Sequence, residues 1–251
     1  MPNQFLIALL LSSIAGFSTT IGAIFACLIK RPSVRMLSLG LGFSAGVMLN
    51  VSFLQMLPEA LELAGLLSTY AAFFIGMFIM AGLDLFVPHV ENEIARTDFD
   101  PDLIRTGKLT AVGVSIHNFP EGMITFLGTI VNIKVGLLLT FAIALHNIPE
   151  GISVSVPIFC ATGDRKKAFK LSFLSGLAEP LGALVAGLIL FQFLNNTVLG
   201  IGLSLVAGIM IFLSLHELIP VAHKHSDSRR IVSVGVIAGM IIMVITIPLL
   251  A

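Results

Sequence analysis

Eight apolar stretches, each about as long as a membrane-spanning helix, follow one another along this chain with only short polar segments between them. A helix needs roughly 20 largely apolar residues to cross the hydrocarbon core of a bilayer. Charged residues make up only 11% of the chain, against roughly 25% in an ordinary soluble domain. These features predict an all-α polytopic membrane protein, a single eight-helix transmembrane domain over residues 1–251. The predicted spans are 3–29, 36–57, 66–88, 109–131, 135–160, 168–192, 198–221 and 231–250.

The basic residues predict how these spans are oriented. Of the 14 Lys and Arg residues, only Lys134 lies away from the loops that follow spans one, three, five and seven. Because Lys- and Arg-rich loops stay in the cytoplasm, both termini are expected outside, with the protein in the cell (plasma) membrane. The lipid bilayer is therefore an expected partner. Nucleic acid is not, because no basic patch with interleaved aromatic residues occurs. The oligomeric state stays open, with a homodimer among the alternatives.

A polar motif occurs twice inside these apolar stretches. IHNFPEGM begins at Ile116, and LHNIPEGI begins at Leu145, with His, Asn, Pro, Glu and Gly at the same spacing. A charge at the bilayer centre costs at least about 2.5–3.5 kcal/mol, so each carboxylate needs a partner. No Lys or Arg lies within the core of any predicted span. Either the carboxylates are protonated, or a cation from outside the protein supplies the positive charge.

Helical geometry brings the two motifs together. Residues four apart lie on one helix face, so His117 points with Glu121, and His146 points with Glu150. Counted from the nearest flanking lysine, the two histidines lie roughly 14 and 18 Å deep at helical rise, on antiparallel neighbours, and Glu179 in span six reaches mid-depth as well. The set that these positions bring together is His117, Asn118, Glu121, His146, Asn147, Glu150 and Glu179.

This set of nitrogen and oxygen donors suits borderline divalent metals such as Zn, Fe, Mn, Co or Cd. The alternative is that the polar residues only fix helix packing through interhelical hydrogen bonds. Repetition of the whole set at one depth favours the metal site.

The paired HNFPEG and HNIPEG sequences resemble the signatures of the ZIP family, the zinc- and iron-regulated-type metal transporters. The resemblance covers the whole chain and is closest to the compact bacterial members. It implies import of a divalent metal ion into the cytoplasm, zinc first, with iron, cadmium and manganese as further candidates. The ion would be cargo and not a cofactor. The resemblance also implies a metal site between spans four, five and six, with the seven residues above as ligands; one bound ion or two stays open.

The resemblance extends to a second polar group at the inner ends of spans three and seven. The sequences DLFVPH and LHELIP are similar to the family's exit site, which implies that role for Asp84, His89, His216 and Glu217. Depth alone would also place these four residues near one another.

Two polar features of the outer half keep two interpretations each. Glu59 and Glu62 either attract cations or are simply solvated at the membrane interface. Met48, Asn50 and Ser52 either line a path into the membrane or pack between helices.

Two other functions remain as alternatives. An intramembrane zinc protease would need H-E-x-x-H, which His216 and Glu217 begin, but Pro220 stands where the second histidine belongs. A di-iron enzyme would need Glu-x-x-His, whereas here the order is His-x-x-x-Glu. A proton-coupled carrier of an organic solute could use His and Glu as a proton relay. The sequence favours a metal transporter and not an enzyme.

Overall fold

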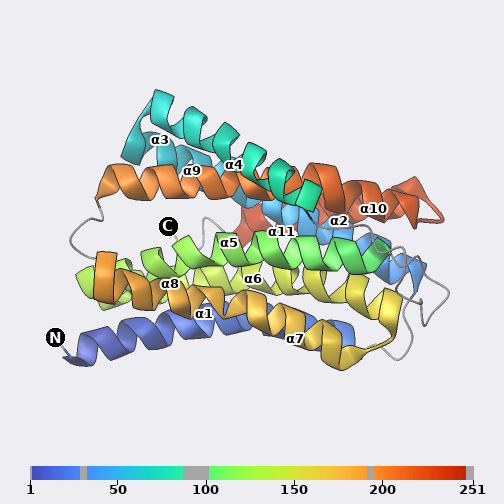
Figure 1. Ribbon diagram of the computed structural model, residues 1–251, viewed down its shortest axis with the longest axis horizontal. Helices are drawn as coiled ribbons and strands as arrows, with labels where there is room; N and C mark the ends of the chain where they lie inside the picture. The colour runs from blue at the N-terminus through green and yellow to red at the C-terminus, as the bar shows by residue number, and fades with distance from the viewer. Residues whose placement is uncertain (1, 29–32, 87–101, 191–194, 247–251) are drawn as a thin grey trace.

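The protein is a bundle of long helices (Figure 1). The computed structural model describes residues 2–28, 33–86, 102–190 and 195–246, and within these ranges all regular secondary structure is helical, with η marking π-helical turns. The elements are α1 (Pro2–Leu28), α2 (Val34–Val51), η1 (Ser52–Met56), α3 (Leu57–Ala64), α4 (Leu66–Phe86), α5 (Asp102–Val131), α6 (Ile133–Thr162), α7 (Arg165–Gly176), α8 (Ala178–Val185), η2 (Ala186–Leu190), α9 (Asn196–Phe212), η3 (Leu213–Leu218), α10 (Ile219–Lys224) and α11 (Arg229–Thr246).

These elements join into rods that correspond to the predicted spans. Seven helices within the described ranges are long and apolar enough to cross a membrane. The rod that does not meet this criterion is α5, which has 30 residues and carries the first polar motif. The prediction of an all-α polytopic membrane protein is confirmed. Predicted spans four, five and six correspond to α5, α6 and the rod from α7 to η2.

Two span boundaries were predicted wrongly. The second rod runs on through α3 to Ala64, and α5 begins at Asp102 instead of residue 109. Asp102 stands in the first helical turn, where a negative charge is favoured by the helix dipole. Helix therefore continues into polar sequence, which a search for apolar residues does not include. Arg105, which the sequence placed in a loop, consequently lies on α5.

Two of the π-helical turns lie directly before prolines. Pro58 and Pro220 are each the second residue of the α-helix that follows. A proline ring clashes with the carbonyl four residues earlier, and the turn before it widens accordingly. Thus Leu57 N–H donates to Ser52 O and Ile219 N–H donates to Ser214 O, both five residues back. Such π-turns often accompany functional sites.

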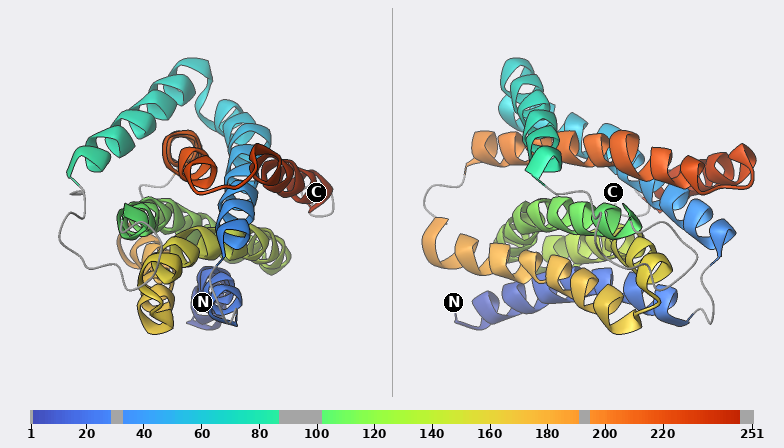
Figure 2. Two further views of the ribbon diagram at one scale, coloured as in Figure 1. Left: turned by 90° about the vertical axis from the view of Figure 1, so that its right-hand side faces the viewer. Right: turned by 45° about the vertical axis from the view of Figure 1, so that its right-hand side comes forward.

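The helices form two groups, one above the other in the left view of Figure 2. In the first group, α1, α5, α6, α7 and α8 pack against one another. In the second, α2 packs on α11, and α9 packs on α3 and α4. Contacts of α2 with α6 and of α5 with α9 join the groups.

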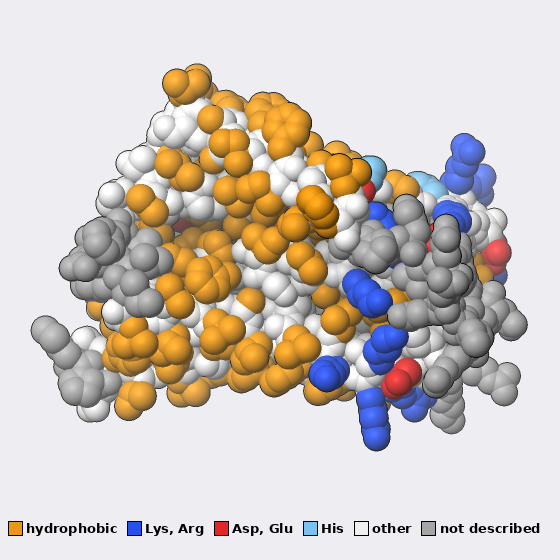
Figure 3. Space-filling model, viewed as in Figure 1, with side chains coloured by type: hydrophobic (Ala, Val, Ile, Leu, Met, Phe, Trp, Pro, Cys, Tyr) orange, Lys and Arg blue, Asp and Glu red, His pale blue; other side chains and the backbone are white. Residues whose placement is uncertain are grey.

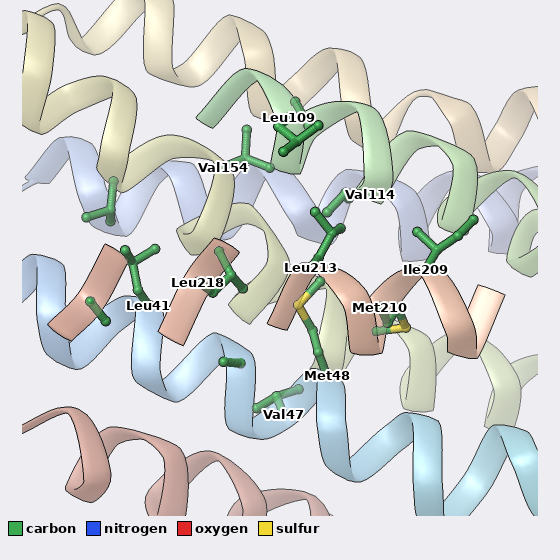
Figure 4. Close-up of a cluster of buried hydrophobic side chains, with 14 of the residues drawn as sticks. Leu41, Val47, Met48, Leu109, Val114, Val154, Ile209, Met210, Leu213 and Leu218 are labelled. Atoms are coloured by element: carbon green, nitrogen blue, oxygen red, sulfur yellow. The ribbon is translucent and has the colours of Figure 1, made fainter. Parts of the chain in front are cut away.

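Buried apolar side chains fill the junction between the groups (Figure 4). Met48 of α2, Met210 of α9 and Leu213 of η3 lie with Val114 of α5 and Val154 of α6 in one cluster. Outside, hydrophobic side chains cover most of the face shown in Figure 3, and the visible Lys and Arg side chains gather at one end. This is the surface expected of a protein surrounded by lipid, with one polar end.

Candidate metal centre

The two polar motifs face each other across the contact between α5 and α6. His117 Nε2 lies 2.9 Å from Glu150 Oε1, and His146 Nε2 lies 3.0 Å from Glu121 Oε1. Each histidine thus meets the glutamate of the other motif, and the ring centroids of the two histidines are 6.2 Å apart. The sequence predicted that the motifs would meet; it did not predict this reciprocal pairing.

Three of these residues converge closely enough to share one metal ion. His117, Glu121 and His146 each offer a ligand atom within 4.8 Å of the others. Nitrogen and oxygen ligands about 2.1 Å from a tetrahedral zinc ion stand roughly 3.4 Å apart. The observed 3.4 Å from His117 Nε2 to Glu121 Oε1 and 3.0 Å from His146 Nε2 to the same oxygen are close to that spacing. An ion could enter this set with small side-chain shifts.

The two asparagines connect the site to the neighbouring helices. Asn147 Nδ2 donates to Glu179 Oε2 at 2.8 Å and to the carbonyl of Ala15 at 3.0 Å. Asn118 Nδ2 donates to the carbonyl of Ser175 at 3.3 Å. Within the described ranges, the side chain of Glu179 therefore reaches the site through Asn147 and not through a histidine. Four of the seven predicted ligands, His117, Glu121, His146 and Glu150, form one chain of contacts. Asn147 and Glu179 form a separate hydrogen-bonded pair, and Asn118 bonds toward α7.

Several buried oxygens of the site lack a hydrogen-bond donor within the described ranges. All seven predicted ligands are at most 3% exposed. Among the described residues, no donor reaches Asn118 Oδ1, Glu121 Oε2, Asn147 Oδ1, Glu179 Oε1 or either carboxylate oxygen of Glu150, whose approach to His117 lacks hydrogen-bond geometry. A buried polar atom left unpaired costs about 1–3 kcal/mol. A bound cation would satisfy several of these oxygens at once, so the donor set fits a divalent metal.

The positive charge near these glutamates is limited to imidazole. Within the described ranges, the ion pairs of Glu121 and Glu150 are made only with His117 and His146, and Glu179 has no Lys or Arg partner. This agrees with the absence of Lys and Arg from the span cores.

The glycine that ends each motif explains why the helices approach so closely. A Cβ on Gly122 would collide with the carbonyl of Glu179 on α8, and one on Gly151 would collide with the carbonyl of Thr19 on α1. Only a residue without a side chain allows these backbone contacts. Gly122 therefore brings α8, and with it Glu179, against the site.

A small cavity lies against the site. It has a volume of about 30 Å³ and is lined by Gln55, Glu59, Glu121 and His146 together with apolar side chains. Glu59 is exposed, so the cavity joins the central carboxylates to an acidic residue near the surface. In Figure 3, an acidic side chain is visible between the two helix groups, at the end away from the basic residues. Gln55 was not predicted from the sequence as a cavity residue. It lies in η1, where no periodic pattern of polar residues indicates which side chains face the site.

The remaining candidates for an entry path, Glu62, Met48, Asn50 and Ser52, do not line this cavity. Met48 lies in the hydrophobic core, and Asn50 Nδ2 donates to the carbonyl of Met240 on α11 at 3.2 Å. Packing is therefore the role of Met48 and Asn50. Ser52 is buried, and the cavity lining does not include it.

At the basic end, three of the four predicted exit residues lie together, and two of them contact an arginine. Arg105 Nη2 lies 2.6 Å from Asp84 Oδ1, and Arg105 Nη1 lies 3.7 Å from Glu217 Oε2. His216 Nε2 lies 3.4 Å from Asp84 Oδ2. His89 lies outside the described residues. We refer to Asp84, Arg105, His216 and Glu217 as the inner cluster.

The fold and the site together define a class. A lipid-embedded helical bundle with a buried, cation-deficient set of imidazoles, carboxylates and amides at mid-depth is the arrangement of a membrane metal transporter.

Comparison with known proteins gives the family. Residues 103–247 match the family model described as ZIP Zinc transporter. A protein of Oceanobacillus iheyensis named zinc transporter ZupT is 47% identical, over 99% of this chain and 100% of the relative. Proteins of the same name from Chlorobium phaeovibrioides and Clostridium perfringens are 49% and 44% identical, over 99% and 98% of this chain and 100% and 97% of the relatives. The chain belongs to the ZIP family, as its motifs predicted, and this confirms a transporter over an enzyme.

Proposed function

We propose that this protein imports zinc across the plasma membrane into the cytoplasm through the site between α5, α6 and α8. Transport of a divalent metal follows from membership of the ZIP family, and zinc is the metal in the names of its relatives. The observation that carries the proposal is the reciprocal pairing of two buried histidines with two buried glutamates, in a place where no Lys or Arg is paired with those glutamates within the described chain.

The proposed ligands fall into two sets. His117, Glu121, His146 and Glu150 hold the first ion, because their nitrogens and carboxylates already converge. Asn118, Asn147 and Glu179 contribute amide and carboxylate oxygens that lack donors within the described chain, and Asn147 is hydrogen-bonded to Glu179. These oxygens, with Glu121 Oε2, would suit a second ion beside the first.

The proposed path crosses the membrane from the small cavity to the inner cluster. Glu59 at the outer mouth attracts the cation, and the cavity leads to Glu121 and His146. The ion leaves past Asp84, His216 and Glu217, which lie at the basic end of the bundle. Since basic segments stay in the cytoplasm, that end faces inward and both termini face outward.

Iron, cadmium, manganese and cobalt are proposed as weaker cargo. Imidazole with carboxylate ligands accepts all of these borderline ions. With Cys160 the only cysteine whose side chain the structure describes, and with that side chain buried in the apolar core, nothing in the site favours soft metals through sulfur.

We also propose a homodimer as the assembly to test. Large apolar side chains of α4 and α11 lie exposed, among them Phe74, Phe78, Ile241 and Ile245. Cross-linking in intact membranes distinguishes a dimer from a monomer whose exposed helices contact lipid alone.

Uptake by the purified protein in liposomes tests the proposed function. A trapped zinc indicator should report zinc uptake by the wild type and loss of uptake by the double variant Glu121→Gln/Glu150→Gln. The matched control is Glu62→Gln, a carboxylate removed from an exposed position outside the site. Metal-independent uptake of an organic solute would instead support the solute-carrier alternative, and tight zinc binding without uptake would contradict transport.

A further inference from the structure

Arg105 occupies the middle of the inner cluster. Its guanidinium contacts the side-chain oxygen of Asp84 at 2.6 Å, the backbone carbonyl of Asp84 at 3.1 Å and Glu217 Oε2 at 3.7 Å. The side chain of Arg105 is 11% exposed, and those of Asp84 and Glu217 are 16% and 7% exposed. The charges of this pairing are therefore less screened by water than those of a surface salt bridge.

This arginine also joins the two helix groups. Arg105 lies on α5 of the first group, whereas Asp84 lies on α4 and Glu217 on η3 of the second. Elsewhere α4 and α5 make few contacts with each other. The guanidinium is thus a principal polar connection between α4 and α5 at this end of the bundle.

We propose that Arg105 is a tethered cation that occupies the inner cluster between transported ions, and that a leaving metal ion must displace it. This inference rests on the proposed exit path. Two carboxylates and an imidazole would otherwise form a strong site for a transition metal, and an ion bound there would leave slowly. Arg105 competes for the same oxygens of Asp84 and Glu217. The competition keeps the cluster from trapping cargo.

An arginine suits this role because its charge cannot be removed. A guanidinium stays protonated in proteins, so Arg105 cannot yield to a metal by losing a proton as a lysine could. It must move. Its long, flexible side chain allows the charged end to swing toward water while the helix stays in place.

Chemical labelling of the wild-type protein tests this movement without a mutation. A dicarbonyl reagent that modifies arginine should label Arg105 slowly in metal-free buffer, and at least about fivefold faster with saturating zinc, because the displaced guanidinium is exposed. Arg35 and Arg229, which are exposed, serve as internal controls whose labelling rates should not change. An unchanged or slower rate at Arg105 would overturn the proposal.

The same labelling in Glu121→Gln/Glu150→Gln locates where zinc acts. The faster labelling of Arg105 should persist there, because the inner cluster is intact. If it disappears, zinc acts through the central site and Arg105 is not displaced by an ion in the inner cluster.

Binding measurements give an independent test in that same double variant. Adding Arg105→Gln should tighten residual zinc binding at least about tenfold, since the carboxylates lose their competitor, while Arg105→Lys should give a smaller gain. Adding Asp84→Asn together with Arg105→Gln removes both members of the closest ion pair, Arg105 and Asp84. This variant should lose the gain in affinity. Because it leaves no unpaired carboxylate at residue 84, it also guards against misfolding from that cause. No gain in a folded Arg105→Gln variant contradicts the inference. Failure of the wild type to transport zinc would contradict the proposed function instead.

Discussion

The central site and the inner cluster are built from the same kinds of side chain but balance their charge differently. At the centre, Glu121 and Glu150 pair only with histidines within the described chain. In the inner cluster, Asp84 and Glu217 surround a guanidinium. One set of carboxylates therefore has only imidazoles as possible cationic partners within the described chain, whereas the other has a permanent positive charge beside it.

Depth in the membrane explains the difference. A permanently charged arginine at the bilayer centre is costly, at least about 2.5–3.5 kcal/mol. At the basic end of the bundle, Arg105 can reach water with its charged end. On the proposals above, the central carboxylates bind the cargo ion, whereas Asp84 and Glu217 are paired with an arginine that moves away when the ion leaves.

The largest expected effect is a difference in zinc transport between substitution of a central histidine, His146, and substitution of an inner-cluster histidine, His216. His146→Ala should reduce zinc transport at least about 100-fold, because it removes a buried ligand that faces Glu121. His216→Ala should reduce it only about threefold, because the side chain of His216 is 54% exposed and shares Asp84 with Arg105. Initial rates in liposomes give both numbers, and equal losses would remove the distinction between the sites.

The second largest effect is expected from acid, which should lower the zinc affinity of the central site. Histidine and carboxylate ligands must be deprotonated to bind a metal, so protons compete with zinc and affinity falls as pH falls. Zinc affinity should drop about tenfold or more between about pH 7.5 and pH 5.5, where an ordinary histidine gains its proton. Titration of the purified protein measures this, and a constant affinity over that range would contradict a ligand set that contains two histidines.

The close helix contacts of the central site can be tested through glycine. Gly151→Ala should destabilise the protein by about 1–3 kcal/mol, because its methyl group would meet the carbonyl of Thr19. Gly82→Ala is the matched control, since nothing lies within 4 Å of a Cβ there. Thermal unfolding in detergent should show a lower midpoint for the first variant alone. Equal midpoints would mean that α1 and α6 can separate without cost.

The smallest effect is expected at the outer mouth. Glu59→Gln should slow zinc uptake about threefold at low ionic strength and less at high salt, because attraction of the ion is screened. Glu62→Gln, on the same helix but outside the cavity lining, should change the rate less. A salt-independent loss would indicate a ligand and not an attracting charge.

The apolar stretches made the helical fold predictable, and the paired motifs predicted that α5 and α6 bring their histidines and glutamates together. Apolar stretches of membrane length predicted the helices, and the i, i+4 spacing placed His117 with Glu121. The partner of each histidine in the other motif could not be predicted, because it depends on the rotation of α5 against α6. That rotation is set by backbone contacts at Gly122 and Gly151 with helices distant in sequence.

Arg105 was the main residue that the sequence misplaced. A hydropathy criterion ends a span where polar residues begin, but α5 extends back to Asp102. Arg105, which was predicted to lie in a loop, is therefore part of this helix, and its side chain reaches residues of two other helical rods. Its spacing from Asp84 and Glu217 follows no helical period, because all three lie on different rods. Only the arrangement of the rods brings them together.

Thermal unfolding with and without zinc tests the central claim most directly. A ligand at 100 times its dissociation constant stabilises a protein by about 2.7 kcal/mol. Zinc should therefore raise the unfolding midpoint of the wild type and of Asp84→Asn/Glu217→Gln. At a zinc concentration below that needed to occupy the inner cluster, it should leave the midpoint of Glu121→Gln/Glu150→Gln nearly unchanged. Full stabilisation of this last variant, with loss of the effect in the inner-cluster variant, would contradict the assignment of the central carboxylates to the cargo ion.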